Sequence, residues 1–148
     1  MRFRDLTELK SYIAQIEADN HRTKGRWNAA QIFYHLAAAF EGSIEGLPPG
    51  FNRVVRSVLR PFRALVTRVR FPPYLPIPAA VADKLAPPKD LDFKEQQQRL
   101  IDAIDRFDSH TEPLAPHPVL GPLSNAEALG FHLRHSEHHL AFVELLGS

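Results

Sequence analysis

The chain has 148 residues, a formal net charge of +1 and no cysteine. This length suits one domain around a single core, so we expect one domain over residues 1–148. The lack of cysteine excludes disulfides, thiolate metal sites and a cysteine nucleophile. The N-terminal residues lack the apolar segment of a secretory signal, and no apolar run approaches the roughly 18 residues of a membrane span. We therefore expect a cytoplasmic protein, with no nucleic-acid partner and no membrane segment.

Residue pairs with the spacing of a capping box predict the starts of four helices. The pairs are Asp5 with Glu8, Asn28 with Gln31, Asp92 with Glu95, and Ser124 with Glu127. Apolar residues at helical spacing follow each pair. Trp27 precedes the second helix at the position from which a hydrophobic staple would pack against Ile32. The predicted helices cover about 5–19, 28–45, 92–112 and 124–147, with a polar loop at 21–26. No segment has the alternation of a β-strand, so the sequence predicts an all-α four-helix bundle.

The crossover between the second and third helices is a long Arg/Pro-rich insertion, residues 48–90. No acidic residue occurs from Gly46 to Ala82, yet six arginines occur from Arg53 to Arg70. We expect a short amphipathic helix interrupted at Pro61, followed by a Pro-rich extended segment over 71–88.

Arginines of this insertion recur at i, i+3, i+7 and i+10, which is one stripe of a helix: Arg53, Arg56, Arg60 and Arg63. The stripe would bind a phosphate, a carboxylate substrate or a membrane surface, or it is the solvated face of a helix packed on the bundle. Basic residues without interleaved aromatic residues are a weak sign of nucleic-acid binding.

The last predicted helix carries four histidines within eight residues. At about 100° per residue, the apolar face of this helix is centred on His135 and His139. His132 and His138 flank that centre at about 60° on either side, and Glu137 points away from it.

Two imidazoles four residues apart on an inward face can hold one metal ion. His35 on the second helix also faces inward, beside Leu36 and Ala39. We therefore predict a divalent-metal site at His35, His135 and His139, with an open position; zinc, nickel and iron all accept imidazole. Alternatively, these are core histidines bonded to backbone carbonyls, or a pair of them binds haem.

Three neighbouring side chains are candidates for supporting roles around this site. Gln31, one turn before His35, would bond a metal-bound water or the second nitrogen of a ligand histidine, or it serves only as a helix cap. His132 and His138 would support the ligands or act as a base, or they are surface histidines.

The chain resembles the DinB-like (YfiT-type) superfamily of metal-dependent four-helix bundles over nearly its whole length. The matching segments are Trp27-Asn28-Ala29-Ala30-Gln31-Ile32-Phe33-Tyr34-His35-Leu36 and His135-Ser136-Glu137-His138-His139-Leu140-Ala141-Phe142. It looks closest to an uncharacterised branch, the domain of unknown function 1569. Features that suggest this branch are Phe3-Arg4-Asp5-Leu6, the segment from Pro116 to Ser124, and the His-His pair near the end.

The resemblance implies a bundle whose metal is held by one histidine of the second helix and two of the fourth, here His35, His135 and His139. Characterised relatives include transferases that use bacillithiol or mycothiol, and other members resemble metal-dependent hydrolases. A homodimer is also plausible by resemblance alone.

Two functional hypotheses follow. The first is a metal-dependent enzyme that activates a water molecule or an external thiol toward a small-molecule substrate, with Arg53, Arg56 and Arg60 holding an anionic group. The second is a non-catalytic module that binds a ligand, a partner or a membrane surface, and whose histidines are structural.

Overall fold

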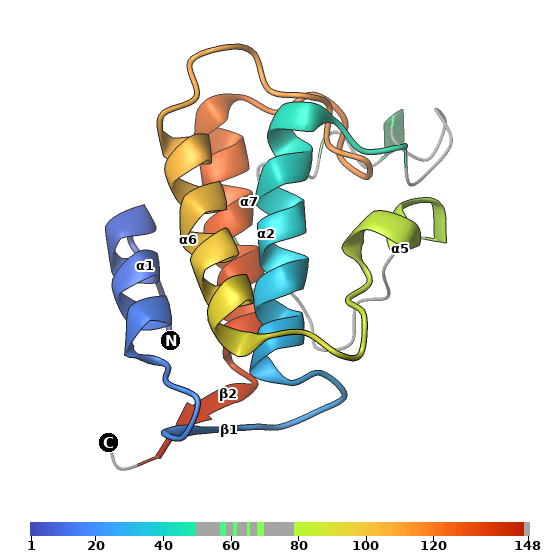
Figure 1. Ribbon diagram of the computed structural model, residues 1–148. Coiled ribbons are helices and arrows are strands. Elements are labelled where there is room, and N and C mark those ends of the chain that lie inside the picture. The colour runs from blue at the N-terminus through green and yellow to red at the C-terminus, as the bar shows by residue number, and fades with distance from the viewer. Residues whose placement is uncertain (50–56, 59–60, 62–64, 66–67, 70–78, 147–148) are drawn as a thin grey trace.

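The computed structural model describes residues 1–49, 57–58, 61, 65, 68–69 and 79–146 (Figure 1). The described part is mostly helical. Its helices are α1 (Leu6–Gln15), α2 (Ala29–Glu45), α5 (Ala79–Leu85), α6 (Phe93–Asp108) and α7 (Asn125–Leu140). Two short strands, β1 (His21–Thr23) and β2 (Val143–Leu145), complete it. The all-α expectation is therefore wrong in one respect, since a two-stranded antiparallel sheet is present.

The four predicted helix starts are confirmed. In each of α1, α2, α6 and α7 the capping side chain accepts a hydrogen bond from the backbone N–H three residues on; the caps are Asp5, Asn28, Asp92 and Ser124. These bonds satisfy donors that the first helical turn leaves without an intrahelical partner. In α2 and α7 the third residue bonds back to the cap, which completes the capping box.

The helices pack around one main core. Helix α2 lies between α6 and α7 on one side and α5 on the other, while α1 packs against α6 and α7 (Figure 1). Fully buried side chains from α1, α2, α6 and α7 meet there: Leu9, Ile13, Phe33, Leu36, Phe40, Leu100, Ile104 and Leu140. This packing fixes the relative positions of α2 and α7, the two helices that carry the candidate ligands.

The last helix is shorter than predicted. Helix α7 ends at Leu140, and β2 pairs with β1 in the register His21 to Leu145 and Thr23 to Val143. The N–H of Lys24 also donates to the carbonyl of Phe142 at 2.8 Å. No Gly or Pro occurs from residue 140 to 146, and the chain leaves the helix where β2 pairs with the distant β1.

The first helix also ends early, at Gln15 instead of near residue 19. The buried Gln97 of α6 donates its amide N–H groups to the carbonyls of Ile13 and Ile16, both at 2.8 Å. Asn20 donates in turn to the carbonyl of Gln15. Side chains thus take the place of the next helical turn.

Much of the Arg/Pro-rich insertion lies outside the described residues, including most of the expected amphipathic helix. The last part of the insertion is described. There the prediction of an extended segment is wrong, because residues 79–85 form α5. No proline occurs from residue 79 to 86, and Val81 and Leu85, one turn apart, are buried against α2. Among the described residues, no helix is both long and apolar enough to cross a bilayer.

Candidate metal centre

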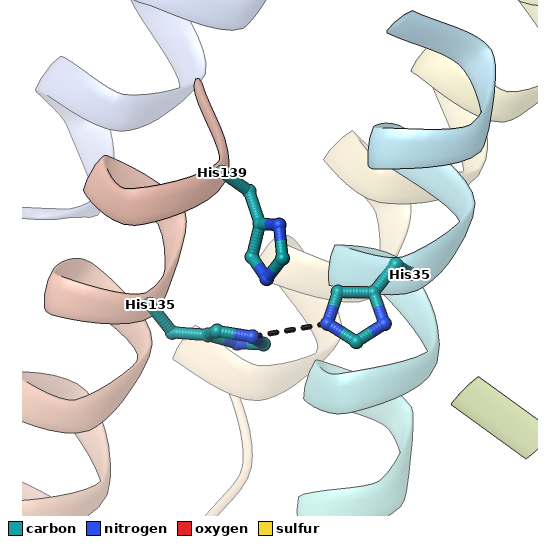
Figure 2. Close-up of side chains that lie close together, drawn as sticks. All are labelled: His35, His135 and His139. Carbon is teal, nitrogen blue, oxygen red and sulfur yellow. Dashed lines mark hydrogen bonds between the residues drawn. The ribbon is translucent and has the colours of Figure 1, made fainter. Parts of the chain in front are cut away.

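Three histidines from two helices converge between α2 and α7 (Figure 2). His35 projects from α2, and His135 and His139 project from successive turns of α7. One ring nitrogen from each lies within 4.8 Å of the other two. The Nε2 atoms of His35 and His135 are 3.1 Å apart. The three histidines that the sequence singled out thus lie close together, in an arrangement that could hold a metal ion.

His35 has a fixed orientation. Its Nδ1 lies 2.8 Å from the carbonyl oxygen of Leu85, which can only accept, so Nδ1 carries the proton and Nε2 presents its lone pair. Burial lowers the pKa of His35 to about 4, although the bond to Leu85 raises it and the nearby His138 lowers it. The imidazole is therefore neutral at pH 7, which is the form that binds a metal.

The other two histidines lie in a similarly dry setting. Burial lowers the pKa of His139 to about 2 and that of His135 well below its usual value, and the neighbouring imidazoles lower both further. Trp27 stacks on the ring of His139 with centroids 5.6 Å apart and also contacts His35. The side chains of His135 and His139 nevertheless keep part of their surface accessible.

The donor set fits a divalent ion. Zinc bonds imidazole nitrogen at about 2.0–2.1 Å, so two tetrahedral ligand nitrogens lie about 3.3 Å apart. The His35–His135 separation of 3.1 Å already matches this value. The ring nitrogens of all three histidines lie no more than 4.8 Å from one another, which is the same order of separation. Three neutral imidazoles leave at least one position open, as in catalytic sites.

His132 is buried, not at the surface. Its ring stacks on Phe40 with centroids 4.0 Å apart, and its Nε2 lies 2.7 Å from the Oγ of Ser43. Its Nδ1 has no hydrogen-bond partner in the described part of the chain. Within the described residues, it therefore makes no hydrogen bond to His35, His135 or His139.

His138 and Glu137 also differ from expectation. His138 is buried and packs edge-on against His139, with ring centroids 4.8 Å apart. Glu137 points away from the histidines, as predicted, but it does not reach solvent. It accepts a hydrogen bond from the N–H of Phe3 at 2.6 Å and pairs with Arg134 at 2.7 Å. The N-terminal segment covers this side of α7, which a single helix pattern does not reveal.

Gln31 acts as a helix cap and as a tether. Its Oε1 accepts from the N–H of Asn28 at 3.0 Å, and its Nε2 donates to the carbonyl of Pro88 at 2.9 Å. Both polar atoms are thus engaged, which argues against a direct bond to a metal-bound water. The substrate candidates Arg53, Arg56 and Arg60 lie outside the described residues.

Two residues at the site were missed by sequence reasoning. Trp27 was expected only to staple the start of α2, yet it stacks against two of the histidines. Leu85 contributes a backbone carbonyl, which carries no sequence signal at all.

The fold and the site together define a mostly helical protein with an inward-facing three-histidine cluster. A protein-family model described as "Protein of unknown function (DUF1569)" matches residues 1–145, and the chain belongs to this family. The match confirms the branch that the sequence resembled. No curated protein and no solved structure matches the chain.

Proposed function

We propose that this chain is a divalent-metal-dependent enzyme of the DinB-like superfamily, built on a four-helix bundle with the insertion as its crossover. The reaction would be transfer of an external thiol to an electrophilic small molecule, or hydrolysis. The observation that carries the proposal is the convergence of His35, His135 and His139 within 4.8 Å.

The residues of the chain prepare this site in three ways. Burial keeps the three imidazoles neutral, so that no proton has to be displaced from a cationic ring before an ion binds. The carbonyl of Leu85 holds His35 in one tautomer. Trp27 packs against the rings of His139 and His35 on one side of the cluster. A bound divalent ion would supply Lewis acidity that lowers the pKa of a water molecule or of an external thiol.

The lack of cysteine agrees with a thiol that comes from outside the chain. Within the proposal, Arg53, Arg56 and Arg60 would hold an anionic group of the substrate. Reversal of these three charges is then expected to raise the KM for an anionic substrate and to leave the metal content unchanged.

The test is the metal content of untagged protein, measured by elemental analysis on the wild type and on His35→Ala and His139→Ala. We expect about one ion per wild-type chain and a loss in both variants. His110→Ala, in the loop after α6, is the matched control and is expected to retain the ion. Wild-type protein without a stoichiometric ion, or retention by both ligand variants, would contradict the proposal and favour structural histidines. The loaded enzyme is then assayed for consumption of a low-molecular-weight thiol with electrophilic substrates.

A further inference from the structure

Helix α5 rests on α2 directly beside His35. Val81 and Leu85 are buried against Ala38 and Ala39, whose small side chains let the two helices approach closely. This contact brings the end of α5 to the α2 turn that follows His35.

Two hydrogen bonds then tie the backbone after this contact to α2. The Nδ1–H of His35 donates to the carbonyl of Leu85 at 2.8 Å, and the amide of Gln31 donates to the carbonyl of Pro88 at 2.9 Å. Gln31 and His35 are four residues apart on α2 and so lie on the same face of that helix. The two bonds and the apolar contact therefore act on the same short stretch of chain, residues 79–88, which we name the strap.

We propose that the strap is a positioning element of the metal centre: it holds the proton of His35 on Nδ1 and directs Nε2 toward the ion, and Gln31 holds the strap in place. This inference rests on the proposed function, because it assigns the strap a role toward the ion.

The physical reason is that His35 is buried, so its second nitrogen needs a partner inside the protein. The carbonyl of Leu85 is that partner and can pair only with a protonated nitrogen. If the strap moves away, the Nδ1–H loses its acceptor and the tautomer with a proton on Nε2 becomes accessible. That tautomer places a proton where the ion must bind, and loss of such supporting bonds commonly weakens metal binding 10- to 100-fold.

Gln31→Glu removes the hydrogen bond to Pro88 and keeps the helix cap. A glutamate at this position still accepts from the N–H of Asn28, so the capping box is kept, and a carboxylate suits the positive end of the helix dipole. Its ionised form cannot donate to the carbonyl of Pro88. Val81→Ala loosens the apolar contact independently. Lys84→Ala, on the exposed side of α5, is the matched control.

The first readout is the tautomer of His35 in the metal-free protein, from long-range proton–nitrogen NMR spectra of the imidazoles. We expect a single Nδ1–H tautomer in the wild type and in Lys84→Ala, and a mixture in Gln31→Glu and Val81→Ala. The second readout is the Kd for zinc, by competition with a chromophoric chelator. We expect it to rise at least about tenfold in the two strap variants and to stay unchanged in the control.

Wild-type tautomer and wild-type zinc affinity in both strap variants would overturn the inference. So would an equal loss of affinity in Lys84→Ala. Wild-type protein that binds no zinc would overturn the proposed function instead, and the tautomer in the metal-free variants would still decide whether the strap positions His35. Circular dichroism of each variant verifies that the helices are intact.

Discussion

Replacing Glu137 by alanine tests how the N-terminal segment is held against α7. Glu137 and Arg134 have side chains 2% and 7% exposed, and both bond to the backbone of Phe3, at its N–H and its carbonyl respectively. The substitution removes the carboxylate from a buried guanidinium and leaves the N–H of Phe3 without this acceptor. Removal of one partner from a buried ion pair typically costs about 3–5 kcal/mol. For a chain of this size, that loss lowers Tm by about 6–20 °C.

Urea unfolding monitored by circular dichroism measures this loss. Glu45→Ala is the matched control, since Glu45 pairs with Arg106 at 2.5 Å but both side chains are about half exposed. Such an exposed pair contributes about 1 kcal/mol at most. Glu137→Gln keeps an acceptor for Phe3 while removing the charge, so we expect an intermediate loss. Equal effects of Glu137→Ala and Glu45→Ala would refute the argument that burial makes the first pair structurally necessary.

Three further predictions concern stability. Leu9→Ala is expected to lower the free energy of unfolding by about 2–5 kcal/mol, because Leu9 is fully buried where α1 joins the core; a change below about 1 kcal/mol in urea unfolding would argue against that contact. Ser124→Ala removes the cap of α7 and is expected to cost about 1 kcal/mol in the same assay, whereas Ser124→Gly should cost less. Burial lowers the pKa of His117 to about 4, and burial with the nearby His117 lowers that of His132 to about 3. Both histidines have a usual pKa of 6.5 in the unfolded chain, so below pH 6.5 the unfolded chain binds more protons than the folded one. The free energy of unfolding is therefore highest above pH 6.5 and decreases as the pH falls toward 4. We expect metal-free protein to lose roughly 2 kcal/mol per histidine between pH 7 and pH 5, and equal unfolding midpoints at these two pH values would contradict this expectation.

Local signals predicted most of the helical structure. Asp5, Asn28, Asp92 and Ser124 mark their helix starts correctly, because a cap bonds to a backbone N–H only three residues away. Helix ends were less predictable, because they depend on distant groups. Gln97 of α6 bonds the carbonyls at the end of α1, and β1 pairs with the residues that would have continued α7.

The candidate site was also predictable only where the signal was local. The helical period of α7 brought His135 and His139 to one inward face, and the resemblance selected the same pair together with His35. Features supplied by other segments were not visible in any helix pattern. The carbonyl of Leu85 comes from α5, which the prolines on either side of it concealed. The burial of Glu137 depends on the N-terminal segment packing over α7.

The central claim is that three histidines hold one divalent ion. The most direct test is a crystal structure of untagged, zinc-loaded protein with anomalous data collected on both sides of the zinc edge. We expect one anomalous peak between α2 and α7, about 2.0–2.1 Å from a ring nitrogen of His35, His135 and His139 alike, with at least one coordination position not filled by protein. Absence of a peak at this cluster in zinc-loaded crystals, or a peak held by other side chains, would contradict it.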